Sequence, residues 1–145
     1  MAWKDSARPI DLGLLVLRVG IGLFFAVAHG LPKLMAGPER WEGLGQAIGS
    51  LGLPVVVPTA FGLGAALAEF LGGLLLAAGL LTRWAGAALL GTMIVASAFL
   101  AGQWDPAFAT FGKDVARPME MAVVFLALIF TGAGRLSLDA TWRGR

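Results

Sequence analysis

Four ionisable side chains lie within or at the edges of long apolar stretches of this sequence: Arg18, His29, Glu69 and Glu120. A charged group at the centre of a bilayer costs about 3 kcal/mol on insertion scales, so such a group usually faces the interior of a helix bundle and finds a partner there. Two carboxylates beside a histidine can hold a proton and pass it to a bound molecule. These residue types predict a polar site inside the membrane, and proton transfer to a reduced quinone is one chemistry that it suits.

The first apolar stretch places its ionisable residues on one side of a helix. At about 100° per residue, Arg18, Gly22, Phe25, His29 and Lys33 all fall within about 80° of arc. We expect this stripe to face the interior of the bundle, because lipid on that side would leave its polar groups without partners. Taken singly, Arg18 could instead reach the cytoplasmic interface with its long side chain, and His29 could cap a helix end.

Helix geometry also predicts which of these groups meet. At about 1.5 Å of rise per residue, His29, Glu69 and Glu120 come to similar heights in the outer half of the membrane. Side chains lean toward the N-terminus of their own helix, so these three converge, whereas Arg18 and Glu69 lean apart and are not expected to pair directly. Glu120 has a second interpretation, as an acid in the first turn of a helix that begins at Pro118, where it suits the helix dipole.

Glu69 lies in a run of small residues and has no residue near it in sequence that could neutralise it. The small residues that flank it on its own helix face are Gly62, Ala65, Ala66, Gly72 and Gly73. Small residues let helix backbones approach closely in lipid, which is their commoner meaning, and they can also leave room for a flat ligand. The partners of Glu69 are therefore expected to come from other helices, and we expect neighbours from the first apolar stretch (span one) to neutralise it.

The elements that position these residues are four apolar blocks of a strongly hydrophobic chain. Of its 145 residues, 58% are hydrophobic and only 14% are charged, too few to cover a soluble domain of this size. A helix needs about 20 residues to cross the hydrocarbon core, and no block alternates as a strand would. The sequence therefore predicts one all-α domain over residues 1–145, a polytopic membrane protein folded as an antiparallel bundle of four transmembrane helices. The predicted spans cover about residues 12–31, 58–81, 84–101 and 118–133.

Lysine and arginine set the predicted orientation. The two ends of the chain and the turn near Arg83 carry six of them, whereas loops 33–57 and 102–117 carry four. This bias predicts that both termini are cytoplasmic and that the two loops face outward. We expect the first span to be retained, because it is longer than the core of a signal peptide and lacks a clear cleavage site. Five tryptophans lie near predicted span ends, as in an interfacial belt: Trp3, Trp41, Trp84, Trp104 and Trp142.

Several kinds of site are not indicated. The chain has no cysteine, which excludes disulfides, thiol chemistry and thiolate metal sites within it. One histidine does not make a haem or metal ligand set. The net charge of +2 comes from scattered basic residues, so the composition does not point to nucleic acid as a partner.

Four segments carry a likeness to a known family. They are LLVLRVGIGLFFAVAHGLPKL at 14–34, SLGLP at 50–54, AEFLGGLLLAAGLLTR at 68–83 and GAGRLSLD at 132–139. In this order they resemble the DoxX family of membrane proteins, over about residues 12–139. The resemblance implies a small four-helix protein of the bacterial inner membrane.

The same resemblance implies a setting for the function. The family takes its name from subunits of a thiosulfate:quinone oxidoreductase, and other members are linked to membrane redox and oxidative-stress systems. Carried over by position, the family pattern implies a ligand-binding site made from Arg18, His29, Lys33, Glu69 and Glu120. The segment Ser137–Asp139 is expected to be structural instead, with either end residue capping a short helix or Asp139 pairing with an arginine.

Three functions stay open at this point. The first is a quinone-interacting subunit, in which His29 and Glu69 would hydrogen-bond a quinone head group and a soluble redox enzyme would supply electrons. The second is a non-catalytic membrane scaffold, in which the polar residues only fix helix packing. The third is a small transporter of lipid or solute with a water-filled path lined by Arg18 and Glu69. The sequence does not decide whether the chain catalyses a reaction or forms oligomers, but it requires contact with membrane lipids.

Overall fold

The computed structural model describes residues 9–103 and 111–143, so the expectations for Trp3 and Trp104 lie outside the described part. Helices and turns make up the described ranges, which contain no strand. In chain order the elements are α1 (Pro9–Phe24), η1 (Phe25–Gly30), α2 (Leu31–Met35), α3 (Pro38–Gln46), η2 (Ala47–Leu51), α4 (Pro58–Ala78), α5 (Thr82–Gly102), α6 (Phe111–Thr131) and α7 (Leu138–Arg143). The long helices are α4, α5, α6 and the helix that runs from α1 through η1 to α2.

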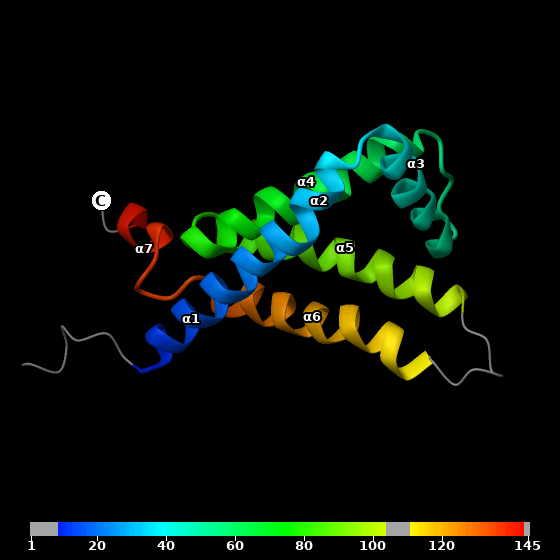
Figure 1. Cartoon of the computed structure of the whole chain (residues 1–145). Helices are drawn as coiled ribbons and strands as arrows, with labels where there is room; N and C mark the ends of the chain where they lie inside the picture. Colours follow the sequence, from blue (N-terminus) through cyan, green and yellow to red (C-terminus); the bar gives the residue numbers. More distant parts are fainter. Residues whose placement is uncertain (1–8, 104–110, 144–145) are drawn as a thin grey trace, which may run out of the picture.

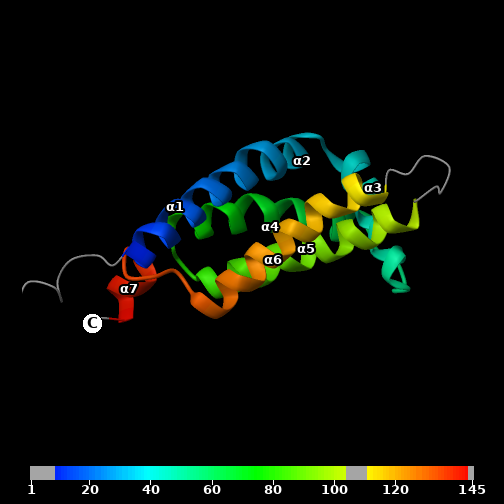
Figure 2. The ribbon, with the colours of Figure 1, turned by 90° about the horizontal axis from the view of Figure 1, so that it is seen from below.

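The long helices pack side by side in an antiparallel order. Figure 1 shows α5 between α4 and α6, with the helix α1–η1–α2 lying diagonally across α4. A small apolar core joins them, and it contains Leu76 of α4, Leu89 of α5 and Phe125 of α6, all fully buried. We call the end of the bundle where α1 begins and α7 lies the terminus end, and the end where α3 lies the loop end; Figure 2 shows both ends from below.

Three of the four predicted spans are long and apolar enough to cross a membrane in the described residues. They are Pro9–Met35, Pro58–Ala78 and Thr82–Gly102. Their outer surfaces are strongly apolar, with Val16 and Phe24 of α1 each about 70% exposed (72% and 69%), as contact with lipid requires. The chain is therefore a membrane protein with three such helices among its described residues, and its fourth span, predicted at 118–133, stays a prediction.

Helix α6 differs from the expectation for the fourth span in where it begins. It starts at Phe111, so Pro118 lies inside the helix and not in its first turn. The interpretation of Glu120 as an acid at a helix start is therefore wrong, because it lies more than two turns into α6. The Gly132–Gly134 segment ends α6 as its composition suggests, with positive φ values at both glycines.

The first long helix changes its winding in the middle. Residues Phe25–Gly30 form a π-helical segment, η1, between the α-helical stretches α1 and α2. Bonds from i to i+5 wind the backbone less per residue than α-helical bonds do, so the buried face shifts along this segment. Ala26 and Gly30 are buried as a result, whereas His29 is exposed.

Close backbone packing holds this helix against α4. A Cβ added at Gly22 would lie 2.5 Å from the Gly73 oxygen, and one added at Gly73 would lie 2.8 Å from the Ala26 nitrogen. A Cβ at Gly30 would overlap the backbone of Phe70. The glycines on the face of α4 turned toward α1 therefore serve close helix packing, which is the commoner role of small residues in membrane helices.

The segment predicted as an outward loop, residues 33–57, is largely helical. Helix α3 and the short η2 fold back over the loop end of α4 and α5 (Figure 1). Two glycines allow the approach, because a Cβ at Gly45 would overlap the Pro58 carbonyl and a Cβ at Gly62 would overlap the Trp41 carbonyl. This segment contains no apolar block, so its hydrophobicity pattern does not predict this wall of the bundle.

Candidate functional site

The centre of the candidate site is an ion pair between the first long helix and α4. Lys33 Nζ lies 2.6 Å from both Oε1 and Oε2 of Glu69. The Glu69 side chain is 3% exposed and that of Lys33 is 26% exposed. A buried carboxylate is tolerated when a cation is this close, so the pair answers why a carboxylate lies in a glycine-rich helix. The prediction that span one supplies the partner of Glu69 is confirmed, with Lys33 in that role.

The loop end of the helix is fixed by α3. The indole Nε1 of Trp41 donates a hydrogen bond of 2.8 Å to the carbonyl oxygen of Lys33. Trp41 itself is held against α4, because its own carbonyl packs on Gly62. The backbone of Lys33 is thereby tied to α3, and its side chain to α4.

A cavity of about 590 Å³ opens beside this pair. It lies between α4 and α5 and is walled at the loop end by α3 and η2, with Leu44 and Ile48 among its residues. Its volume falls in the range of ligand pockets, roughly 300–1,000 Å³. The walls are mostly alanine, glycine, valine and phenylalanine, and the polar side chains in the lining are those of Lys33, Arg40, Glu69 and Thr92.

The cavity is open at the outer surface of α4 and α5. Its lining includes Gly64 of α4 and Gly91 of α5, and both residues are exposed. A Cβ added at either of these glycines would meet no atom within 4 Å. Unlike Gly62 and Gly73, they therefore do not serve helix packing, and their small size leaves open space in the cavity.

Arg18 is placed far from this pair, at the terminus end. Its Nη1 donates a hydrogen bond of 2.7 Å to the Ala77 carbonyl at the end of α4, and its Nη2 donates to the Leu136 carbonyl. The residue is 1% exposed. Carbonyls at a helix C-terminus lack intrahelical partners and carry partial negative charge, so a guanidinium suits them. The prediction that Arg18 and Glu69 do not pair directly is confirmed.

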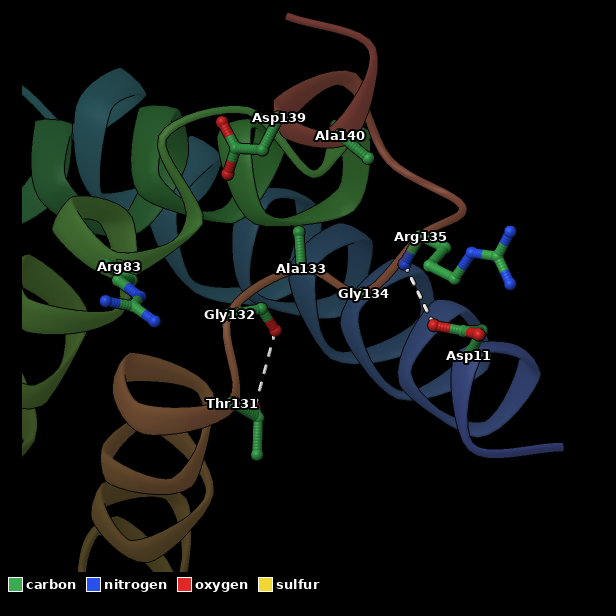
Figure 3. A pocket seen from close by; sticks show the side chains of 9 residues that line it. All are labelled: Asp11, Arg83, Thr131, Gly132, Ala133, Gly134, Arg135, Asp139 and Ala140. Carbon is green, nitrogen blue, oxygen red and sulfur yellow. Dashed lines mark hydrogen bonds between the residues drawn. The ribbon is translucent and has the colours of Figure 1, made fainter. Parts of the chain in front are cut away.

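The segment after α6 closes the terminus end through two aspartates. Asp139 accepts hydrogen bonds from the amides of Leu81 (2.8 Å) and Thr82 (3.0 Å) and so caps the start of α5. Asp11 accepts one from the Arg135 amide (2.9 Å), as the dashed line in Figure 3 shows. Asp11, Arg135 and Asp139 line a second, smaller cavity of about 270 Å³, and its two carboxylates accept hydrogen bonds from backbone amides.

The structural interpretation of Ser137–Asp139 is confirmed in the main. Ser137 Oγ accepts a hydrogen bond from the Ala140 amide (3.2 Å) and caps the short helix α7. Asp139 caps the longer helix α5 and not the short one. Its electrostatic interaction with Arg18 agrees with the expected proximity of an arginine.

His29 and Glu120 do not join the site. Both are exposed, and neither lines the cavity beside Glu69. The ring of His29 lies 5.0 Å from that of Phe25 on its own helix. The expected convergence of His29, Glu69 and Glu120 is therefore wrong: the π-helical segment turns His29 off the buried face, and Glu120 faces outward from α6. A ligand-binding role for the predicted site residues stays a prediction.

Sequence reasoning missed three contributors to this site. Thr92 and Arg40 line the cavity, and Trp41 holds Lys33 in place. Thr92 could have been found from the sequence. A tight turn joins α4 and α5, so the two helices pair antiparallel and Thr92 comes to the same level as Glu69. Arg40 and Trp41 lie in a segment whose fold the sequence did not reveal.

The chain matches a protein-family model over most of its length. The DoxX family model matches residues 13–102, which contain the helix with Lys33, the α3 wall, the helix with Glu69 and all the residues that line the cavity. Comparisons with curated proteins and with solved structures gave no match. Since the family model covers more than half of the chain, this membrane protein belongs to the DoxX family.

Proposed function

We propose that this chain is a quinone-binding membrane subunit of a redox system, and that the cavity beside Lys33 and Glu69 is its binding site. The observation that carries the proposal is the composition of this cavity: an apolar space of about 590 Å³ with one ion pair on its wall. A quinone ring with an isoprenoid tail matches such a space, because its body is apolar and its head carries two oxygens. Exposed Gly64 and Gly91 would let it enter sideways from the lipid.

The ion pair suits the head group of this ligand. The Lys33 ammonium has three N–H groups, of which the Glu69 carboxylate engages two. The third can donate to a ring oxygen, and the carboxylate oxygens have lone pairs left for a ring hydroxyl. Reduction of a quinone needs two electrons and two protons. In this proposal a soluble oxidoreductase partner supplies the electrons, and the Lys33–Glu69 pair relays the protons.

The test fills the cavity without touching the ion pair. Gly64→Leu should lower the affinity for a short-chain benzoquinone in lipid nanodiscs at least about tenfold, because the new side chain occupies ligand space. Thermal unfolding should change little, since no atom lies within 4 Å of a Cβ at this position. Gly13→Leu is the matched control, at another exposed helix glycine with open space but outside the cavity. Equal quinone affinities of both variants and the wild type would show that the cavity is not the quinone-binding site.

We further propose that the protein lies in a bacterial inner membrane with its terminus end in the cytoplasm. The support is the excess of lysine and arginine at the two chain ends and the short turn. Because the chain has no cysteine, single cysteines can report the two sides. On intact spheroplasts an impermeant maleimide should label Ser50→Cys at the loop end, and it should label Thr141→Cys at the terminus end only after permeabilisation. The opposite labelling pattern would contradict this orientation.

A further inference from the structure

We propose that the cavity selects its ligand by hydrogen-bond donors, so that it binds a ring diol, the reduced form of a quinone, more tightly than the corresponding dione. This inference rests on the proposed function and specifies which form of the ligand the site recognises. The residue that decides between the two forms is Thr92 of α5.

Thr92 and Glu69 line the same cavity and lie at the same level of the neighbouring helices α4 and α5. A Cβ added at Gly72 would lie 3.3 Å from Leu89 Cγ, which sets the register of α4 against α5. The two helices are antiparallel. The residue three positions before Gly72 and the residue three positions after Leu89 therefore lie at the same level, about 4.5 Å along the helix axis from this contact. These residues are Glu69 and Thr92, and both line the cavity.

The hydroxyl of Thr92 is available only as an acceptor. Its Oγ1 donates a hydrogen bond of 2.8 Å to the carbonyl of Leu89 in its own helix. A threonine hydroxyl has one proton and two lone pairs, so once that proton is committed, a ligand meets lone pairs alone. Thr92 is half-buried and lines the cavity.

The wall formed by Glu69 and Lys33 also offers hydrogen-bond acceptors, and it offers one donor in addition. The Glu69 carboxylate is an acceptor, and both of its oxygens keep lone pairs beyond the bonds to Lys33. The remaining N–H of Lys33 is the donor on that side. A ligand that spans the cavity thus meets acceptor and donor beside Glu69, but only an acceptor at Thr92.

This asymmetry separates diol from dione. A ring hydroxyl facing Thr92 donates to it, and the hydroxyl at the other end donates to Glu69. A dione can accept from Lys33 at one end but places a carbonyl oxygen against the lone pairs of Thr92 at the other. A site that hydrogen-bonds a hydroxyl discriminates against the analogue that lacks it, because polar groups are left unpaired. We expect the diol to bind about tenfold more tightly.

A consequence for the bound redox couple follows from this preference. Tenfold tighter binding of the reduced form raises the two-electron midpoint potential of the bound couple by about 30 mV. The chain would therefore make its ligand easier to reduce by the partner, and it would retain the reduced product longer than the oxidised substrate.

The experiment compares both forms of one probe on Thr92 variants in nanodiscs. A short-chain benzoquinone and its hydroquinone, kept under argon, are titrated against the wild type, Thr92→Val and Thr92→Ser. In Thr92→Val the hydroquinone loses its hydrogen bond and the quinone loses its unfavourable contact, so the about tenfold preference for the hydroquinone should disappear. Thr92→Ser keeps the hydroxyl and should keep the preference. Thr131→Val is the matched control, because Thr131 also bonds its own helix backbone but lies outside the cavity.

The outcomes separate this inference from the proposed function. If the wild type binds both forms equally, or if Thr92→Val weakens both forms by the same factor, the selectivity is refuted while quinone binding stands. If the wild type binds neither form, the proposed function fails and the selectivity with it. A hydroquinone preference that disappears in Thr92→Val and persists in Thr92→Ser supports the inference.

Discussion

Lys33→Met is expected to lower the free energy of unfolding by about 3–5 kcal/mol, since breaking a buried ion pair leaves one charge without compensation. The Glu69 side chain is 3% exposed, and Lys33 Nζ is 2.6 Å from both of its oxygens. Methionine keeps the length and apolar stem of lysine, so the loss reports the charge and not packing. The free energy of unfolding is measured by steric trapping of reversibly unfolding protein in lipid bicelles.

Two further variants make this measurement specific. Lys33→Met combined with Glu69→Met should recover most of the lost stability, because a buried pair replaced by apolar side chains of similar size is often neutral or better. Arg40→Met is the matched control: Arg40 also lines the cavity but is exposed, so its removal should stay within about 0.5 kcal/mol of the wild type. A loss in Lys33→Met no larger than in Arg40→Met would mean that the pair does not hold the helices together.

Gly62→Ala is expected to release α3 from the bundle. The added Cβ would overlap the carbonyl of Trp41, a backbone atom that cannot move aside unless the whole of α3 shifts. Overpacking of this kind costs about 3 kcal/mol when the neighbour is rigid. Hydrogen exchange of residues 38–46 should accelerate more than that of α5, because α3 is the element displaced.

Gly64→Ala provides the comparison, two residues along the same helix. Its Cβ would meet no atom within 4 Å, so the change should be neutral or stabilising by up to about 1 kcal/mol through helix propensity. Equal hydrogen-exchange rates of α3 in the two alanine variants would contradict the close contact between Gly62 and the Trp41 carbonyl. The pair therefore tests whether α3 is a fixed wall of the cavity.

Much of the fold could be predicted from the sequence because lipid imposes a simple length rule. The apolar blocks at 12–31, 58–81 and 84–101 correspond to Pro9–Met35, Pro58–Ala78 and Thr82–Gly102. The segment that became α3 could not be found in this way, because PERWEGLGQ is too polar and too short for a span. Its helix depends on contact with α4 through Gly45 and Gly62, which no local pattern encodes.

The candidate site was predicted in part for a similar reason. That Glu69 takes its partner from span one followed from the cost of an unpaired carboxylate in lipid, and Lys33 lay on the predicted stripe. His29 was misplaced because the stripe assumed α-helical winding throughout, whereas Phe25–Gly30 is π-helical. Glu120 was misplaced because height along the helix does not give the direction of the side chain, which faces outward from α6. Its interpretation as a first-turn acid failed because α6 begins before Pro118, and proline is tolerated inside a membrane helix.

The change of winding in the first long helix has a consequence for insertions and deletions. This helix is clamped at both ends, by Arg18 to carbonyls at the terminus end and by Lys33 to Glu69 at the loop end. The segment Phe25–Gly30 sets the angular offset between the two clamps. A chain one residue longer or shorter between Arg18 and Lys33 could satisfy both clamps only by converting this segment to a different winding. The number of residues between them is thus as strict a requirement of the protein as their identity.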